Sequence, residues 1–152
     1  MAQVTGTLIE GKPIVEIALA DALPAPPEVS STSVPQQFAV REYRALLDTG
    51  ADITCICDHV VSECALKQYG FERMIGAVGP SLHETYMVRI GILLGNQAEP
   101  DQAQRGLFQL EPLVAARIRD NQWFDLIIGT DILSNHEFTL TRGGGFRLEL
   151  FS

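Results

Sequence analysis

The stretch ALLDTGAD, from Ala45 to Asp52, decides how this sequence is interpreted. An apolar run ends in an acid and a Thr-Gly turn follows at once, so a carboxylate is placed where a strand stops. A lone buried carboxylate is costly unless another group shares or satisfies its charge. The 152-residue sequence contains no second Asp-Thr-Gly and no Asp-Ser-Gly. The chain therefore supplies half of any site that needs two such loops.

Length and composition indicate a globular protein with one core. Hydrophobic residues make up 46% of the 152 residues and charged residues 20%, which is far from the composition of disordered chains. We expect residues 1–152 to form a single domain. The net charge of −8 argues against a nucleic-acid partner and against docking on an anionic membrane.

The chain shows no sign of export or membrane insertion. Its first residues lack the basic start and apolar core of a signal peptide, and no apolar run approaches the length of a membrane span. The three cysteines are an odd number, which favours free thiols in a reducing compartment. We expect a soluble cytoplasmic protein.

The cysteines raise the alternative of a metal site. Cys55, Cys57, His59 and Cys64 lie close in sequence, but they lack the paired spacing of known metal sites. We therefore expect no metal and no cofactor, with Cys55 and Cys57 on a half-buried strand and Cys64 on a helix face. The isolated His83 and His136 are expected at loop or surface positions.

Alternating apolar and β-branched residues predict an all-β fold with one or two short helices. Strands are expected at residues 4–9, 13–19, 38–47, 71–75, 86–94, 107–115, 124–128, 138–141 and 146–151, with a hairpin turn at 76–80 and a C-terminal hairpin at 137–151. Residues 23–37 contain four prolines and predict a surface loop. Residues 95–106 predict a second, polar loop, and 117–123 a polar connection. Asp58 is expected to cap a helix at 59–68, and Gly129 to open one at 130–134.

Two further segments accompany the Asp-Thr-Gly loop. The first is DLIIGTDIL, residues 125–133, an apolar strand that ends in glycine before a short helix. The second is MIGAVG, residues 74–79, an apolar hairpin tip flanked by glycines. In the loop itself, Gly50 allows a close approach of the backbone to the carboxylate, and Asp52 adds a second acid.

Along the chain the three segments follow one another as ALLDTGAD, MIGAVG and DLIIGTDIL. In this order they resemble the retropepsin family of aspartic proteases, and the match is closest to its cellular and bacterial members. The resemblance implies a closed, barrel-like β lobe that carries one catalytic Asp and works as a homodimer. It implies an aspartic endopeptidase, a hydrolase whose partners are a second copy and a peptide or protein substrate.

The resemblance also implies roles for individual residues. Asp48 and its symmetry mate would form the catalytic pair, with Thr49 reaching across the interface and the Gly50 amide near the carboxylates. Substrate contacts are implied for Ala51 and Asp52, for a closing flap made of Ile75, Gly76, Ala77, Val78 and Gly79, and for pocket walls at Ile127 and Ile128.

Physical chemistry supports the need for two copies. Hydrolysing an amide through an activated water requires one carboxylate as base and one carboxylic acid as proton donor. Two carboxyls in contact share a proton rather than both ionising. A symmetric homodimer supplies the second acid, and the apolar face of the C-terminal hairpin at 137–151 is the predicted dimer contact.

The sequence departs from the viral pattern after the bracing glycine. Viral relatives usually carry an Arg there, paired with the acid that Asp52 matches, whereas this chain has Thr130 followed by Asp131. Other interpretations stay open at this point. Asp48 could simply cap its own turn, the fold could serve as an inactive dimeric peptide-binding or scaffold module, or the chain could be a carbohydrate- or metal-binding β-sandwich.

Overall fold

The computed structural model describes residues 2–22, 42–96 and 106–152 of the chain. The expected surface loop at 23–37, the start of the strand expected at 38–47, and residues 97–105 of the second loop lie outside the described residues. Strands form most of the described chain. They are β1 (Ala2–Thr7), β2 (Ile14–Asp21), β3 (Glu42–Leu47), β4 (Cys55–Cys57), β5 (Gln68–Gly76), β6 (Gly79–Leu93), β7 (Gly95–Asn96), β8 (Leu107–Gln109), β9 (Leu113–Ile118), β10 (Leu126–Ile128), β11 (Glu137–Thr141) and β12 (Gly145–Leu150). The helices are α1 (Asp58–Glu63) and α2 (Thr130–Leu133).

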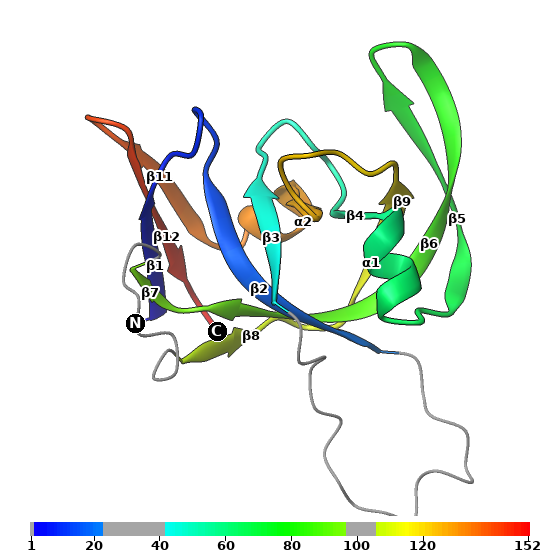
Figure 1. Ribbon diagram of the computed structural model, residues 1–152, viewed down its shortest axis with the longest axis horizontal. Coiled ribbons are helices and arrows are strands. Elements are labelled where there is room, and N and C mark those ends of the chain that lie inside the picture. The colour runs from blue at the N-terminus through cyan, green and yellow to red at the C-terminus, as the bar shows by residue number, and fades with distance from the viewer. Residues whose placement is uncertain (1, 23–41, 97–105) are drawn as a thin grey trace, which may run out of the picture.

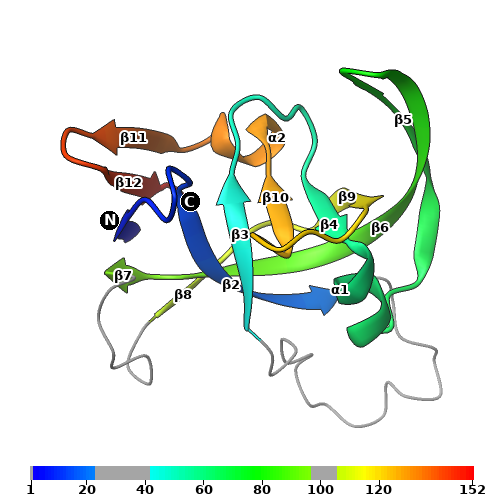
Figure 2. The same cartoon turned by 45° about the horizontal axis from the view of Figure 1, so that its top comes forward.

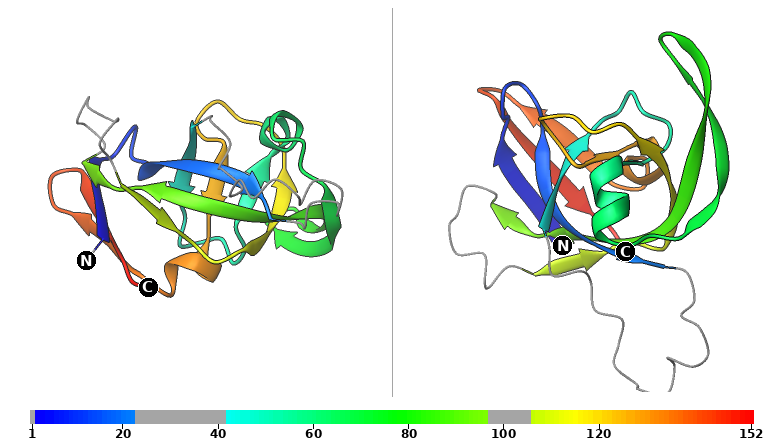
Figure 3. Two further views of the ribbon diagram at one scale, coloured as in Figure 1. Left: turned by 90° about the horizontal axis from the view of Figure 1, so that it is seen from below. Right: turned by 45° about the vertical axis from the view of Figure 1, so that its right-hand side comes forward.

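The larger sheet closes into a barrel. Its strands follow the order β2-β3-β10-β4-β9-β6, and an additional antiparallel pairing of β6 with β2 joins the two ends. The prediction of an all-β, barrel-like lobe with short helices is therefore confirmed. A second sheet has the order β11-β12-β1-β7. Figure 1 shows the β5–β6 hairpin and the β11–β12 hairpin on opposite sides of the barrel, and the views in Figure 3 agree.

The core fills the barrel because alternate residues of its strands are apolar. Ile17 and Leu19 of β2 and Val88 and Ile90 of β6 have no exposed surface, as the period of two in a strand requires. Helix α1 adds the buried pair Val60 and Val61, and β12 adds Phe146, Leu148 and Leu150, each at most 2% exposed. The C-terminal hairpin is thus partly built into the core.

Helix α1 differs from its predicted form. The residue at its N-cap is Cys57, which makes no side-chain capping bond, and the Asp58 carboxylate accepts a hydrogen bond from Arg117 instead. The helix ends at Glu63 rather than at residue 68, because Ala65 adopts a left-handed backbone conformation with φ of 49°. Gln68 already belongs to β5, where it pairs with Tyr86.

Four other segments also differ from their predicted form. The single strand expected at 107–115 is broken before Pro112 into β8 and β9, because proline has no amide hydrogen for the ladder. Strand β9 continues to Ile118, so the polar connection begins later than predicted. Gly95 and Asn96, expected in a loop, pair with β1 as a parallel strand. Strand β4 was expected to be half-buried but is buried along its whole length.

Candidate active site

Asp48 lies at the carboxyl end of β3, where the barrel holds its backbone. Strand β3 runs parallel to β10, and the Asp48 amide donates to the Ile128 carbonyl at 2.9 Å. The Gly50 amide donates to Asp48 Oδ1 at 2.8 Å, and the Ala51 amide donates to the Asp48 carbonyl at 3.2 Å. The half-buried Asp48 carboxylate is thus oriented by its own turn, and the loop that follows β3 stands at the top of the barrel in Figure 1.

Glycine at position 50 has a steric reason. A Cβ placed on Gly50 would lie 3.1 Å from Asp48 Oδ1, which is tighter than ordinary van der Waals contact. A side chain at this position would therefore push against the carboxylate that the Gly50 amide orients.

The segment that opens α2 braces the Asp48 loop from behind. The Thr130 amide donates to the Ala51 carbonyl at 2.8 Å, and the Thr130 hydroxyl donates to the same oxygen at 3.2 Å. A Cβ on Gly129 would lie 2.7 Å from that carbonyl oxygen and 3.0 Å from the Ile53 backbone. Only glycine fits at position 129 while the loop keeps this position.

A second brace, which the sequence did not reveal, joins Thr54 to Asp131. The Asp131 carboxylate accepts hydrogen bonds from the Thr54 amide at 2.9 Å and from the Thr54 hydroxyl at 2.8 Å. The Gly129 amide donates to Thr54 Oγ1 at 3.2 Å. Thr54 is fully buried, so these bonds satisfy a polar group that cannot reach water.

These contacts join the Asp48 loop to α2 without Asp52. Asp52 is exposed and forms no ion pair within the part of the chain that the structure describes. The link between the loop and the bracing helix is carried by Thr130 and Asp131. The positions of both residues were singled out in the sequence, but their partners Ala51 and Thr54 emerge only from the fold.

The hairpin tip predicted to act as a flap stands clear of the Asp48 loop (Figures 1 and 2). Ile75 is 84% exposed and Val78 is fully exposed, so no described residue covers these apolar side chains. Gly79 has a φ of +112°, a conformation that favours glycine, and the paired Gly76 and Gly79 close the turn around Ala77 and Val78.

The root of this hairpin is held by a charged cluster. Arg117 of β9 contacts Asp58 of α1, and its Nη1 donates to Glu84 of β6 at 3.0 Å. Hydrogen bonds from Arg117 to Asp58, Tyr86 and Glu84 raise the Arg117 pKa, so that it stays charged. His83 Nδ1 lies 2.6 Å from the Arg117 carbonyl. His83 lies on β6 and is half-buried, whereas a loop or surface position was expected.

Strand register separates the two predicted pocket walls, Ile127 and Ile128. Leu46, Ile127 and Cys55 are neighbours across β3, β10 and β4, and Leu46 points to the same side as Asp48 because the two residues are two positions apart along an extended chain. Leu46 and Ile127 are half-buried. Ile128, by contrast, has no exposed surface and packs in the core, so the prediction of Ile128 as a pocket wall is wrong for this chain.

The cysteines occupy structural positions. Burial raises the pKa of Cys55 to about 12, with smaller contributions from the charges of Asp131 and Asp48. Burial likewise raises the pKa of Cys57 to about 12. Cys64 is half-exposed just after α1, where its Sγ lies 3.3 Å from the Tyr43 hydroxyl. None of the three cysteines forms a disulfide. Across residues 2–22, 42–96 and 106–152, no group of three or more His, Cys, Asp and Glu side chains is arranged to hold a metal ion.

His59 belongs to a network that sequence analysis missed. Its Nδ1 lies 2.6 Å from Asp120 and its Nε2 lies 2.8 Å from Asp125, while the other oxygen of Asp125 accepts the Arg44 amide at 2.8 Å. This network joins α1 to the segment that leads into β10. His136 follows α2 and its Nδ1 accepts the Phe151 amide at 3.1 Å.

A barrel that presents one Asp-Thr-Gly loop, braced by a glycine-led helix and flanked by a long hairpin, has the architecture of one lobe of an aspartic protease. A family model described as retroviral aspartyl protease matches residues 10–141. The chain belongs to this family, which confirms the resemblance found in the sequence.

Solved structures agree with the fold. A retropepsin-like aspartic protease from Rickettsia conorii superposes with a TM-score of 0.58 at 7% sequence identity, covering 96% of this chain and 89% of that chain. At this identity the likeness concerns the fold alone. No curated protein matches the sequence significantly. Within the described residues, neither helix has the length and apolar character to cross a bilayer.

Proposed function

We propose that this chain is one half of a homodimeric aspartic endopeptidase. The observation that carries the proposal is the Asp48 carboxylate, with Oδ1 held by the Gly50 amide at 2.8 Å. Asp48 Oδ2 has no hydrogen-bond partner among the described residues. A second copy of the loop would bring another such carboxylate to it, and the two would share one proton while one activates water and the other protonates the substrate carbonyl.

The surrounding residues have roles that fit this chemistry. The exposed Thr49 hydroxyl would bond to the loop of the other copy, and the Gly50 amide would stay near the carboxylates. Ala51 and Asp52 would contact the substrate backbone. The hairpin tip at 75–79 would close over the bound peptide and exclude water, and Ile127 would contact its side chains.

The dimer contact belongs to the C-terminal hairpin, on its β11 side. Strand β12 is paired on both edges, with β11 and with β1, so β11 ends this sheet and has no second strand beside it among the described residues. Leu140 on β11 is 60% exposed. An unpaired edge with an exposed apolar residue favours pairing with a second copy of the strand.

The test of the activity is Asp48→Asn, which removes the ionisable group and keeps the shape. Purified protein is incubated with a denatured protein mixture at roughly pH 4–6, the range expected for paired carboxylates, and new termini are counted by mass spectrometry. Asp48→Asn should lower cleavage by at least about a thousandfold. The matched control is Glu42→Gln, an exposed carboxylate at the opposite end of the same strand, which should cleave like the wild type.

The same experiment separates the two functions considered for this fold. Undiminished cleavage by Asp48→Asn would refute the protease assignment. If neither protein cleaves but both bind peptide, the chain is the dimeric peptide-binding module instead.

A further inference from the structure

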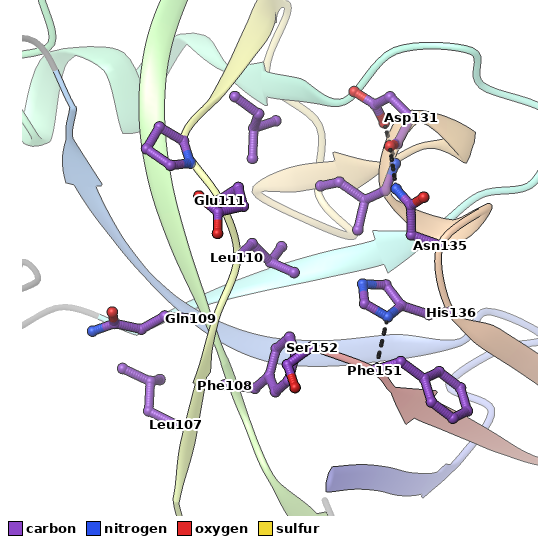
Figure 4. Close-up of a pocket in the computed structure, with 13 residues that line it drawn as sticks. Leu107, Phe108, Gln109, Leu110, Glu111, Asp131, Asn135, His136, Phe151 and Ser152 are labelled. Atoms are coloured by element: carbon purple, nitrogen blue, oxygen red, sulfur yellow. Dashed lines mark hydrogen bonds between the residues drawn. The ribbon is translucent and has the colours of Figure 1, made fainter. Parts of the chain in front are cut away.

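A groove lies on a part of the molecule that the Asp48 loop does not reach. It has a volume of about 720 Å³ and runs between residues 107–113, helix α2 and the end of the chain. Figure 4 shows its lining side chains gathered between the β8–β9 segment on one side and His136 and Phe151 on the other. Phe108, Leu110 and Ile132 supply apolar surface. The volume is typical of ligand sites, which are mostly apolar with a few polar groups.

One wall of this groove is an unpaired strand edge. Strand β8 pairs only with β6 in the described chain. Hydrogen bonds from the Leu110 amide to Ile90 and from the Leu94 amide to Gly106, both 2.9 Å, show that the even-numbered residues of this segment face β6. In an antiparallel pair the intervening residues direct their backbone groups the other way. The amides of Leu107 and Gln109 therefore point away from β6, and no hydrogen bond within the described residues uses them.

The charge on the groove has one sign. Its charged residues are Glu111 and Asp131, and no Lys or Arg lines it. Burial lowers the pKa of His136, so this ring is neutral at neutral pH. A basic side chain is therefore favoured at the rim and an acidic one is disfavoured.

We propose that this groove binds an extended, basic and apolar peptide segment, which adds a strand to the free edge of β8. The peptide backbone bonds to the outward groups of Leu107 and Gln109. Its apolar side chains cover Phe108 and Leu110, and a Lys or Arg side chain lies near Glu111. Strand addition combines backbone hydrogen bonds with side-chain pockets in this way. The site does not use Asp48 and is independent of the proposed cleavage.

The test measures fluorescence anisotropy of a labelled hexapeptide in which valine and arginine alternate. All proteins carry Asp48→Asn, so that the probe is not cut. The same peptide with glutamate in place of arginine should bind at least about tenfold more weakly. Gln109→Pro removes one outward amide hydrogen without touching the bonds to β6, and it should raise the dissociation constant about fivefold, the worth of one hydrogen bond. The matched control Gln109→Ala keeps the amide and should bind like its parent.

Circular dichroism checks that Gln109→Pro is folded. If it is not, Glu111→Lys decides, since reversing this exposed charge should weaken binding of the arginine peptide about fivefold and strengthen binding of the glutamate peptide. Equal affinity for the two peptides would overturn the proposal. If peptide binding is unchanged in both variants, the peptide lies in the cleft at Asp48. If the protein self-associates with rising concentration and Gln109→Pro abolishes this, the groove binds a second copy. Either result overturns the proposal without bearing on the cleavage assay.

Discussion

Gly129 shows how a single residue can determine the position of the Asp48 loop. Its backbone conformation is one that any residue adopts, with φ of −93°, so flexibility is not the reason for a glycine. The reason is contact, because the space of a Cβ is already taken by the Ala51 carbonyl and the Ile53 backbone. A methyl group here would push against the loop that carries Asp48.

The corresponding prediction is that Gly129→Ala destabilises the protein by about 2 kcal/mol, as overpacking of a rigid site does. Cleavage should fall further than this loss of stability alone requires, because the loop that carries Asp48 moves. Urea unfolding and the cleavage assay measure the two effects. For stability the matched control is Gly76→Ala, where a Cβ meets nothing within 4 Å. Equal unfolding midpoints for the two variants would show that the Asp48 loop accommodates the added methyl group without loss of stability, which would contradict the prediction.

His59 is a charge-bearing residue that joins two segments of the scaffold. Both ring nitrogens face carboxylate oxygens, at 2.6 Å on Asp120 and 2.8 Å on Asp125, so only the protonated ring donates to both. Partial burial by itself would lower the pKa of His59, but the hydrogen bonds and charges of Asp120 and Asp125 outweigh it and raise the pKa above its ordinary value. The Tyr43 ring lies nearby, 6.4 Å between centroids.

A pH dependence of stability follows from the sign of this shift. A group whose pKa is raised by folding stabilises fully below its unfolded pKa of about 6.5, and the contribution is lost as the pH rises through the folded value. The free energy of unfolding should therefore fall above neutral pH in the wild type. In His59→Gln this fall should be absent. Urea titrations at pH 6 and 8.5 compare the two, and parallel pH profiles would contradict the prediction.

Among the elements, the β11–β12 hairpin contributes both to the core and to an exposed sheet edge, and its sequence pattern does not distinguish these two roles. Both strands alternate apolar and polar residues. In the structure Phe146 and Leu148 are part of the core, whereas Leu140, which pairs with Phe146, overhangs into solvent. Deleting β12 would therefore remove core residues and could not test the interface. A test of dimer formation must act on β11.

Leu140→Lys is the variant that the hairpin suggests. It places a charge on the exposed apolar side of the free edge and should weaken dimer formation about tenfold or more, the worth of one buried leucine. The matched control is Thr139→Lys, an exposed position on the opposite face of the same strand. Sedimentation equilibrium measures both. An unchanged dimer in Leu140→Lys, or an equal effect in Thr139→Lys, would locate the contact elsewhere.

At the scale of the whole molecule, the barrel presents one Asp-Thr-Gly loop on one side and the edge strand β11 on another. In the proposed homodimer, a second copy would supply both the second catalytic acid and a strand that pairs with β11. Activity and assembly are then linked by mass action.

Dilution tests this linkage. Specific cleavage activity should be constant at high protein concentration and should fall as the chain is diluted below the dimer dissociation constant. In Leu140→Lys the same fall should begin at a protein concentration at least about tenfold higher than in the wild type, because its dimer is weaker. Activity per chain that does not change on dilution in either protein would mean that a monomer works alone, and the half-site argument would be wrong.

The sequence by itself determined the local features of this protein. The Asp48 loop, the glycine before α2, the two hairpins and the all-β class follow from short motifs and from the period of two in strands, which act over a few residues. Neighbouring residues along the chain determine such features directly, so the family resemblance and the barrel class could be predicted from the sequence. The roles of the individual site residues stay predictions.

Only the tertiary structure decided which distant residues meet. Thr54 and Asp131 are 77 positions apart, and His59 and Asp120 are 61 apart, so no local pattern joins them. The closure of β6 onto β2 and the burial of Ile128 likewise depend on strand register around the barrel. Register is set by the packing of the whole core at once, and local periodicity specifies which residues face inward without specifying their partners.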